Sequence, residues 1–464
     1  MPDCSGRRLA CGEGKAATAS PKSGACFDGD PEHAVKFSPF TYPMTPERRV
    51  VVTGLGFITS IGNNRTEVLE SLRNQRTGIE IHPELDQPKS PVKLAGTIKG
   101  FSFPGEDPDG WTFPKGIELS HKQLRSMAPH VVYACAAMRE ALADATLTPE
   151  MVSDPRTGLL CASAGSPRLI FHHLQKMLTH GPLKCHPFAL PASIAGTLNF
   201  NLVALFQIHG PCVSFVSACS SSAHAFGYGL DLIRQNRQDT ILVVGAEDGD
   251  AFTLLPFASV RALTRSTDPK VSPCAFDVKR DGFAGTGGAA VIVLEELEHA
   301  RKRNAPIYAE ALGWGQSSDG YNIMAPEPNG EGLARAIRDA LADAQVSAEE
   351  VDYINAHATA TSPSGVAEIR AIQSIFTNGS PWISSTKSQT GHGLSMAGAL
   401  EAGICSLAIR ERLTPVSINI TELDPECARS RIVTQPVEHA PKTVLKNSSA
   451  FGGANVALLL RCFE

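Results

Sequence analysis

The stretch VSFVSACSSSAHAFGYGL, residues 213–230, changes from the pattern of a strand to the pattern of a helix. Val213, Phe215 and Val216 near its start favour a strand, and the many small residues after Cys219 fit a helix that runs to about Arg234. Cys219 lies at the junction. The dipole of the following helix would favour thiolate over thiol there. The stretch therefore predicts a buried strand, a sharp turn and a helix. Cys219 is either an inert buried cysteine or a nucleophile.

Other segments of the first 300 residues repeat the alternation of strand and helix. The segment 126–145 has apolar residues at helical spacing (Val131, Cys135, Met138 and Leu142). Apolar runs closed by turn residues predict further buried strands at 48–57, 157–165, 240–248 and 287–296. The first part of the chain therefore has the pattern of an α/β unit.

A second series of strands begins near residue 305. Its strands are predicted within 306–315, 351–361, 382–392 and 443–461, with a helix at 397–411. Alternating strands and helices indicate sheets that helices cover on both faces. Two such series predict an α/β protein with a duplicated core, whose halves span 47–300 and 301–464.

Composition limits the class of protein. The chain has 464 residues, more than a single hydrophobic core usually serves, so at least two packed units are expected. Hydrophobic residues make up 42% and charged residues 19%, as in globular proteins. The net charge of −5 argues against nucleic-acid binding, because the chain has no basic excess for phosphates. No run of about 18 or more apolar residues predicts a membrane span.

The cysteines and the N-terminal region indicate the compartment. Twelve cysteines are scattered without a Cys-x-x-Cys pair, which fits neither a zinc site nor a dense disulfide framework. We therefore expect no metal, and mostly reduced cysteines in a cytoplasmic protein. Residues 1–46 are rich in Gly, Ser, Ala and charge, and lack the apolar core of a secretory signal. They are expected to form a flexible extension.

Two histidines and a lysine in the second half lie at corners like that of Cys219. His357 ends a predicted strand in NAHATAT, and His392 ends STKSQTGH before a small-residue helix. Lys387 lies five residues before His392. Equivalent corners of a duplicated α/β core are where open sheets place their ligands. Each residue alone could be structural, but together they predict one shared site.

Several motifs in order resemble the elongating β-ketoacyl-acyl-carrier-protein synthases of the thiolase superfamily. The resemblance extends from about Arg48 to the C-terminus. The motifs are VVVTGLGFITSIGN (50–63), SACSSSAHA (217–225), AFDVKRDGF (275–283), NAHATAT (355–361), SSTKSQTGH (384–392) and NSSAFGGANVALLL (447–460). The resemblance implies a thiolase-like duplicated αβαβα core with mixed five-stranded sheets.

The same resemblance implies a Cys–His–His site for decarboxylative condensation. Cys219 would hold an acyl chain as a thioester, and malonyl-acyl-carrier protein would lose CO₂ beside neutral His357 and His392. The backbone N–H groups of Cys219 and Phe451 would hold the oxyanion. Lys387 would pair with Glu368 or Glu401 and orient the site.

Further contacts are implied by the resemblance. The substrate would meet Thr359, Thr361, Gly452 and Gly453. An acidic acyl carrier protein would dock on a basic rim of Lys122, Arg125, Lys184 and Arg261, although these side chains could equally be ordinary surface charges. The substrates would be carried on the phosphopantetheine of the carrier, without another cofactor. The chain would form a dimer with itself or with a homologous subunit, through the sheet edge at 212–218.

Some positions depart from the family pattern. Ala358 replaces a glycine after the first histidine, and Gly287 replaces an acidic residue. Ser364-Gly365 replaces a Gly-Asp pair, and Ser449-Ala450 precede Phe451 where Phe-Gly is usual. These changes favour a specialised polyketide, polyene or fatty-acid pathway over housekeeping elongation.

The sequence leaves two alternative functions to be weighed against the condensing enzyme. A non-catalytic, chain-length-setting partner subunit would usually lack the nucleophile, which this chain retains as Cys219. A degradative thiolase usually carries a second cysteine near its closing glycine-rich turn, whereas here Cys462 lies beyond that turn. Both features favour the condensing enzyme.

Overall fold

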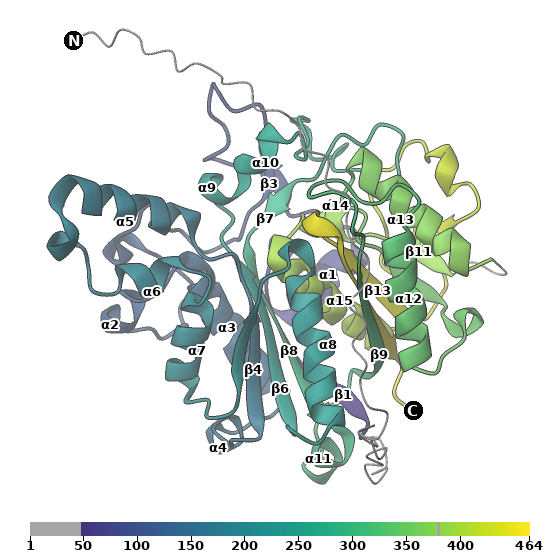
Figure 1. Cartoon of the computed structure of the whole chain (residues 1–464), viewed down its shortest axis with the longest axis horizontal. Helices are drawn as coiled ribbons and strands as arrows, with labels where there is room; N and C mark the ends of the chain where they lie inside the picture. The colour runs from purple at the N-terminus through teal and green to yellow at the C-terminus, as the bar shows by residue number, and fades with distance from the viewer. Residues whose placement is uncertain (1–47, 378–380) are drawn as a thin grey trace, which may run out of the picture. The chain divides into compact units, whose positions relative to one another are not determined.

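Two sets of strands with the same internal order form the main sheet of this computed structural model (Figure 1). The structure describes residues 48–377 and 381–464, so the extension predicted for residues 1–46 lies outside the described residues. The first set, in spatial order, is β5 (Cys212–Phe215), β4 (Thr157–Ala162), β6 (Thr240–Glu247), β8 (Gly288–Glu296) and β1 (Val50–Ile58). The second set is β11 (Trp382–Ser384), β10 (Tyr353–Asn355), β13 (Thr443–Ser449), β14 (Ala454–Arg461) and β9 (Ala309–Ser318), with the short β12 (Arg431–Ile432) outside β11.

The pairing directions repeat from one set to the other. In each set the first three strands run parallel, and the remaining two pair antiparallel with their neighbours. The two sets join where Val50–Val52 of β1 pairs with Ala309–Ala311 of β9, which makes one eleven-stranded sheet. The repeat confirms the predicted duplicated α/β core with mixed five-stranded units.

Two central helices, α8 (Ser221–Arg234) and α15 (Ala397–Glu411), pack against each other between the two sets of strands (Figure 1). Their contact depends on small residues, because a Cβ atom at Gly398 would lie 2.3 Å from the backbone nitrogen of Ala223. Such a distance excludes any larger residue at Gly398. The helix that follows Cys219 and the helix that follows His392 are thereby packed directly together.

Further helices cover the outer faces of the two sets of strands. The helices α3 (Pro129–Asp144) and α7 (Thr197–Phe206) cover the first set, and α12 (Glu331–Asp343) covers the second beside α13 (Ser362–Ile375). The strand β6 shows the consequence. Val243 packs in the central core, whereas Val244 packs in the outer core with α3. A strand covered on both faces is apolar throughout, as predicted for 240–248.

The strand β5 differs from its predicted burial. It is the edge strand of the sheet, and Val213 and Val216 on this segment are 47% and 74% exposed. The prediction of a buried strand at this position is therefore wrong for the single chain. An apolar sequence at an edge leaves backbone N–H and C=O groups free to pair with another strand.

The remaining elements are short or lie at the periphery. A small sheet consists of β2 (Ile79–Ile81), β3 (Leu94–Gly96) and β7 (Gly285–Thr286). The other helices are α1 (Arg65–Arg73), α2 (His121–Leu124), α4 (Pro149–Val152), α5 (Pro167–His180), α6 (Ala189–Ser193), α9 (Ala251–Leu254), α10 (Pro256–Ser259), α11 (Leu297–Lys302) and α14 (Lys387–Thr390). None of the helices in the described ranges combines the length and apolar character that crossing a membrane requires.

Candidate active site

Cys219 lies in a tight turn between β5 and α8. The turn is the 3-10 helix η4 (Ala218–Ser220), and the first residue of α8 follows immediately. Ala218 has a φ of 48°, in the left-handed region that residues other than glycine rarely adopt. The position of the thiol therefore depends on a strained backbone, as is common at functional sites.

The three serines after Cys219 bind three different parts of the site. The Ser220 hydroxyl donates to the Ala454 carbonyl at 2.8 Å, beside the closing glycine-rich turn. The Ser221 hydroxyl donates to the Ala218 carbonyl at 2.6 Å and accepts from the backbone N–H of Ser217 at 2.8 Å, which closes the turn around the thiol. Ser222 binds the segment beyond His392. Short hydroxyl side chains therefore fix this turn from within and to its neighbours.

His357 follows β10, and a carboxylate of α13 holds its backbone. Glu368 accepts hydrogen bonds from the backbone N–H groups of His357 at 2.6 Å and Ala358 at 2.7 Å. The side-chain amide of Asn447 also donates to Glu368, at 2.6 Å. The loop then turns at Ala360, whose φ is 65°. Glu368 thus positions the loop of His357.

His392 follows α14 and pairs as a short parallel bridge with Gly285 of β7. Its N–H donates to the Ala284 carbonyl at 2.8 Å, and its carbonyl accepts from the Thr286 N–H at 3.0 Å. The following 3-10 helix η6 (Leu394–Met396) is held by the Ser222 hydroxyl, which donates to the Ser395 carbonyl at 2.6 Å. His392 is therefore fixed by backbone contacts on both sides.

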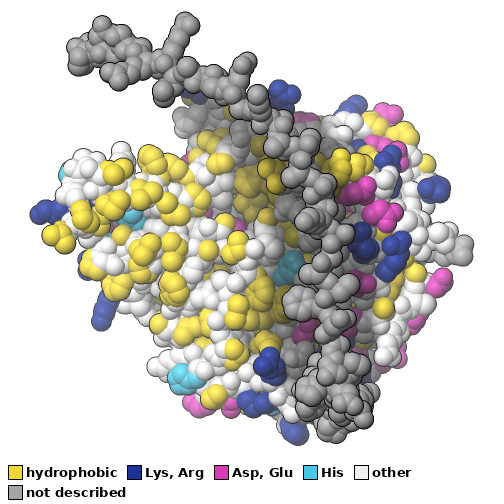
Figure 2. Space-filling view, in the orientation of Figure 1, with side chains coloured by type: hydrophobic (Ala, Val, Ile, Leu, Met, Phe, Trp, Pro, Cys, Tyr) yellow, Lys and Arg dark blue, Asp and Glu magenta, His cyan; other side chains and the backbone are white. Residues whose placement is uncertain are grey.

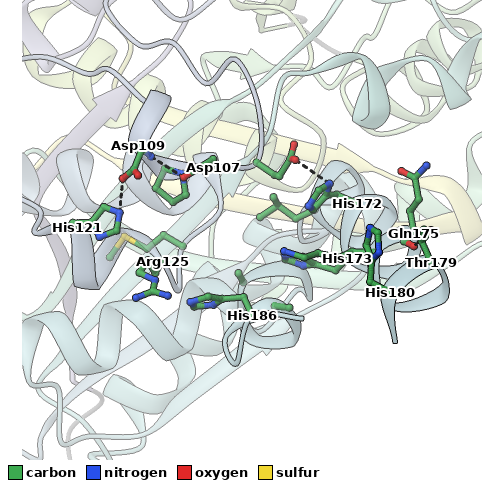
Figure 3. A pocket seen from close by; sticks show the side chains of 17 residues that line it. Asp107, Asp109, His121, Arg125, His172, His173, Gln175, Thr179, His180 and His186 are labelled. Atoms are coloured by element: carbon green, nitrogen blue, oxygen red, sulfur yellow. Dashed lines mark hydrogen bonds and ion pairs between the residues drawn. The ribbon is translucent and has the colours of Figure 1, made fainter. Parts of the chain in front are cut away.

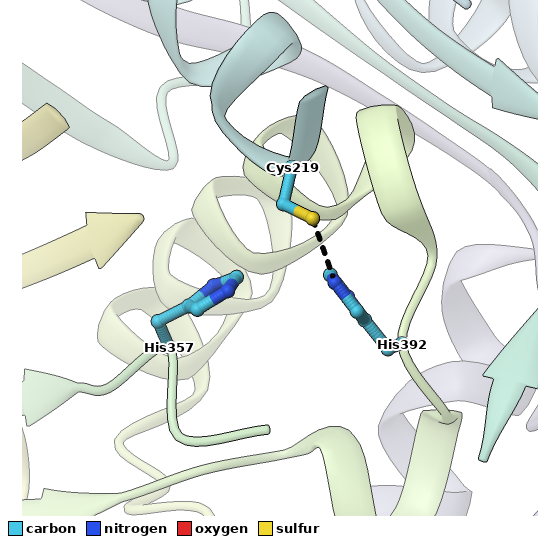
Figure 4. A group of neighbouring side chains, drawn as sticks. All are labelled: Cys219, His357 and His392. Carbon is cyan, nitrogen blue, oxygen red and sulfur yellow. Dashed lines mark hydrogen bonds between the residues drawn. The ribbon is translucent and has the colours of Figure 1, made fainter. Parts of the chain in front are cut away.

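The structure brings Cys219, His357 and His392 together (Figure 4). Nε2 of His392 lies 3.0 Å from Sγ of Cys219. The two imidazole rings are 5.2 Å apart and nearly perpendicular, at 86°. One donor atom from each side chain lies within 4.8 Å of the others. The three side chains, two of them from the second half, face one small space.

The environment favours neutral forms of all three groups. Burial raises the pKa of the Cys219 thiol to about 12, although the Lys387 ammonium acts in the opposite direction. Burial also holds the pKa of His357 and of His392 well below the usual value, and the nearby lysine charges add to this effect. The helix dipole was expected to favour thiolate at Cys219, but burial has the larger effect. The resting pair is a thiol beside a neutral imidazole.

Lys387 pairs with Glu401 rather than with Glu368. Its ammonium donates to Oε1 of Glu401, and both side chains are buried. The other carboxylate oxygen of Glu401 lies 3.2 Å from the ammonium of Lys446, on β13. Of the two candidate partners of Lys387, Glu401 holds the lysine and Glu368 holds the histidine loop.

The closing turn, η8 (Phe451–Gly453), lies next to the thiol. Gly452 and Gly453 have φ values of 80° and 73°, so both positions need glycine. Their N–H groups donate to the carbonyls of Ile323 and Ala450, at 2.9 and 3.0 Å. In this structure these two N–H groups are therefore used within the protein, and the glycines shape the turn that presents Phe451.

A cavity of about 50 Å³ opens onto the three side chains. The predicted substrate contacts Thr359 and Thr361 line it, and their hydroxyls lie 3.0 Å apart. Lys387 lies behind the cavity and does not line it. Its lining residues are Cys219, Phe257, Ala262, Phe283, Met324, Pro326, His357, Thr359, Thr361, Ser364, His392, Ser449, Ala450 and Phe451.

Aromatic rings connect the closing turn with His392. Phe451 lies 6.1 Å from Phe257, which lies 5.6 Å from Phe283. The Phe283 ring meets His392 at 5.0 Å in an edge-on arrangement of 85°. Phe257 and Phe283 were not among the predicted site residues, although Phe283 ends the motif AFDVKRDGF. These rings make the cavity narrow and apolar on this side.

The departures from the family pattern fit their surroundings. A Cβ atom at Gly287 would lie 2.4 Å from the backbone nitrogen of Gly249, so a side chain has no room there. Ala358 is buried, and its carbonyl accepts from the Ser385 hydroxyl at 3.0 Å. A Cβ atom at Gly365 would lie 3.3 Å from Nε of Arg280. The hydrogen bonds that hold His357 and His392 are therefore present despite these changes.

The four predicted docking residues are all exposed. Arg125 lines a hollow of about 810 Å³ beside α2 and α5 (Figure 3). Lys122 lies on α2, and Lys184 belongs to the 3-10 helix η3 (Pro182–Lys184) that follows α5. Arg261 lies elsewhere, next to Ala262 at the catalytic cavity. Of the four residues, Arg125 alone lines the hollow, and Lys122 lies on the same helix α2.

Histidines and acids line the hollow together with Arg125. Nε2 of His121 lies 2.5 Å from Asp109, and Nδ1 of His172 lies 3.0 Å from Glu106 (Figure 3). Burial and the charge of Arg125 lower the pKa of His186. The surface is therefore mixed in charge, with more titratable groups than the four predicted residues provide.

Cys219, His357 and His392 also form a donor set that could hold a metal ion. Binding of Zn²⁺ would need the thiolate, whereas burial favours the thiol of Cys219. Both histidines are neutral and could ligate. The arrangement suits proton transfer from sulfur to imidazole without further change.

Comparisons with known proteins identify the family of the chain. Residues 47–300 match the family described as "Beta-ketoacyl synthase, N-terminal domain", and residues 308–421 match "Beta-ketoacyl synthase, C-terminal domain". A 3-oxoacyl-(acyl-carrier-protein) synthase 1 of Haemophilus influenzae is 39% identical over 90% of this chain and 100% of its own length.

Solved structures show the same fold. A β-ketoacyl synthase from Burkholderia phymatum superimposes with a TM-score of 0.81 and 33% identity, over 90% of this chain and 100% of its own. The structure of the ishigamide ketosynthase/chain length factor superimposes with a TM-score of 0.80 and 33% identity, over 90% of this chain and 100% of its own. The chain belongs to the β-ketoacyl synthase family.

Proposed function

We propose that the chain condenses an acyl group held on Cys219 with malonyl-acyl-carrier protein, with release of CO₂. The name of the Haemophilus relative specifies an acyl-carrier-protein substrate, which supports this substrate class. The acyl chain and the malonyl group would each arrive as a thioester on the phosphopantetheine of a separate carrier molecule. The proposal assigns separate tasks to the two histidines.

The first step loads the acyl chain. His392 accepts the proton of the Cys219 thiol through the 3.0 Å contact as sulfur attacks the thioester carbonyl. The carbon–sulfur bond to the carrier then breaks, and the phosphopantetheine sulfur takes the proton from His392. Because the thiol has a pKa of about 12, this transfer depends on the imidazole rather than on a free thiolate.

The second step extends the chain. The malonyl thioester loses CO₂, and its carbonyl oxygen gains negative charge that neutral imidazole N–H groups of His357 and His392 stabilise. The resulting carbanion attacks the acyl thioester on Cys219. The Cys219 thiolate leaves and takes up one proton from solvent, which balances the step and restores the resting enzyme. His392 must also be neutral during loading, because an imidazolium cannot accept the thiol proton.

Other groups support the chemistry without exchanging a proton or forming a bond with the substrate. The backbone N–H groups of Cys219 and Phe451 would hold the tetrahedral oxyanion, and the Ser220–Ala454 hydrogen bond keeps their two turns adjacent. Lys387, bound to Glu401 behind the cavity, would orient the site. Thr359 and Thr361 line the cavity and would contact the bound thioester.

The contact between Cys219 and His392, with His357 facing them, supports this proposal most directly. The test follows acylation of Cys219 and release of CO₂ separately in three variants. His357→Ala should still load, but release CO₂ about a hundredfold more slowly. His392→Ala should lose both steps, and His209→Ala, on an exposed residue, should change neither. Wild-type CO₂ release by His357→Ala would contradict the division of tasks.

A chain-length-setting partner subunit is the alternative function. The ketosynthase/chain length factor among the similar structures keeps this alternative open. The intact pair of Cys219 and His392 favours the catalytic role, because a non-catalytic subunit needs no nucleophile. Loading of an acyl chain on Cys219 separates the two functions.

We propose that the chain pairs with a second copy or a homologous subunit through β5. This strand is the sheet edge, with Val213 and Val216 exposed. Figure 2 shows apolar side chains over α5 and α6, and α6 packs against α7, which contacts β5. These exposed residues include Phe171, Leu174, Leu178, Leu183 and Leu190. Apolar area beside an unpaired edge is typical of an obligate interface.

The carrier would dock near the exposed Lys122, Arg125 and Lys184, and near Arg261, which is also exposed and precedes Ala262 of the cavity lining. The carrier is acidic, so complementary charge would speed its encounter with this surface.

The departures near the histidines favour a specialised polyketide, polyene or fatty-acid pathway. Residues 47–300 and 301–464 are proposed as the two functional halves. The free cysteines of the described residues support a cytoplasmic location.

A further inference from the structure

Lys446 is a fully buried lysine that the proposed reaction does not use. It lies on β13 with 0% of its surface exposed. In the sheet it pairs with Asn355, two residues before His357. Its ammonium donates to the Asn447 carbonyl at 3.1 Å and to the Ser448 hydroxyl. A buried ammonium is costly unless opposite charge and hydrogen bonds compensate it, so its location needs an explanation.

Glu401 provides that compensation and links Lys446 to the site. Its two carboxylate oxygens serve two lysines: Oε1 accepts from Lys387, and Oε2 lies 3.2 Å from the Lys446 ammonium. All three side chains are buried, and we call them the lysine–glutamate cluster. One carboxylate shared by two ammonium groups leaves excess positive charge on this side of the histidines.

We propose that Lys446 is a positioning residue whose ammonium, shared with Lys387 on Glu401, keeps His357 and His392 in the neutral form that loading and decarboxylation require. The inference rests on the proposed function. It adds a role for a residue that touches neither the substrate nor the thiol.

The physical reason is repulsion between like charges. Protonation of either imidazole would place a third positive charge beside two buried ammonium groups. Both lysines act with burial to lower the pKa of His392 and His357. Burial also disfavours the charged form of Lys446 and lowers its pKa, whereas the Glu401 carboxylate acts in the opposite direction.

Other titratable groups around the histidines stay unchanged in the experiment. Glu368 of α13 binds the backbone of His357, and Glu247 of β6 binds Ser395 beyond His392. Among the described residues, the thiols of Cys219 and Cys405 and the hydroxyl of Tyr353 are further titratable groups near the histidines or the lysine–glutamate cluster. Any change in the histidines on substitution of Lys446 therefore reports on the lysine.

Lys446→Met removes the charge and keeps a long, unbranched side chain. The experiment measures CO₂ release from a carrier-free malonyl thioester against pH, and alkylation of Cys219 by iodoacetamide against pH. In both profiles the rate falls at low pH. In Lys446→Met this fall should occur about one pH unit higher than in the wild type. Lys442→Met, at an exposed lysine beside β13, should leave both profiles in place. Identical acid limbs in Lys446→Met and wild type would overturn the inference.

A double variant separates charge from structure. Glu401→Gln combined with Lys446→Met removes one negative and one positive charge, so the summed charge of the cluster returns to that of the wild type. The acid limb should then move back toward its wild-type position, even if the maximal rate is lower. A limb that stays where Lys446→Met puts it would assign a structural role to Lys446. Circular dichroism and thermal melting verify that each variant folds.

The alkylation arm also separates this inference from the proposed function. If the wild type released no CO₂ from any malonyl thioester, the proposed function would fail. The pH dependence of Cys219 alkylation would still report whether His392 accepts its proton at the same pH with and without Lys446.

Discussion

Sγ of Cys219 and Nε2 of His392 lie 3.0 Å apart, although the two residues belong to different halves of the duplicated core. Cys219 precedes α8 and His392 precedes α15, and these two central helices pack against each other. The Ser222 hydroxyl connects the two segments by binding the Ser395 carbonyl and the Ala399 N–H. The proposed nucleophile and its proposed base are thus positioned by the packing that joins the halves.

The acylation rate should depend on the protonation of His392. Its pKa is held well below the usual value by burial and then by Lys387, whereas the pKa of the Cys219 thiol is about 12. The basic imidazole persists above its own pKa, so the rate should be level between about pH 6 and 9 and fall at lower pH. The measurement is single-turnover acylation with an acyl-pantetheine. A tenfold rise per pH unit across this range would instead indicate a free thiolate.

Removal of the Ser222 hydroxyl should destabilise the junction of the halves. Ser222→Ala would leave the buried Ser395 carbonyl and Ala399 N–H without this partner, at a cost of about 1–3 kcal/mol. Ser259→Ala, at an exposed serine bonded only within its own turn, should cost less than about 0.5 kcal/mol. Urea unfolding measures both. Equal stability of the two variants would argue against a structural role for the Ser222 contact.

A charge on the β5 edge should weaken the proposed dimer. Val216 is 74% exposed in the single chain, and Val216→Asp would place a carboxylate in the proposed apolar interface. We expect a lower mass by light scattering at micromolar protein. Val271→Asp, at another exposed valine, provides the control. An unchanged assembly in Val216→Asp would mean that another surface forms the interface.

Reversal of one charge beside the hollow should impair carrier docking alone. Arg125→Glu would oppose the acidic carrier, so KM for acyl-carrier protein should rise several-fold and the effect should shrink at high salt. The rate with a carrier-free acyl-pantetheine should stay the same. Arg338→Glu, an exposed arginine on α12, is the matched control. If both substrates were affected alike, Arg125 would support the fold rather than the docking surface.

Much of the fold and of the candidate site could be predicted from periodicity and from residues at strand ends. The strands β5, β10 and β11 are parallel members of the two repeats. Cys219, His357 and His392 follow these strands, and all of them face one cavity. Repeated alternation was enough to predict the duplicated core, because central strands such as β6 are covered by helices on both faces.

Other features depend on packing that the sequence does not encode locally. The apolar β5 could be either core or interface, and only its place at the sheet edge decides. Lys387 had two possible acidic partners, and the packing of α15 selects Glu401. The sequence does not indicate that Lys446 is buried, because a lysine in a strand usually faces water. The helix dipole and burial have opposite effects on the pKa of the Cys219 thiol, and the degree of burial is known only from the three-dimensional structure.

The most direct test locates the acyl group. The protein is incubated with a panel of acyl-carrier proteins, digested, and mapped by mass spectrometry. We expect one acyl mass on the peptide that contains Cys219, absent from Cys219→Ala and retained in the control Cys462→Ala, with both variants folded. An acyl group on another residue, or equal loading of Cys219→Ala, would contradict the central claim that Cys219 is the nucleophile.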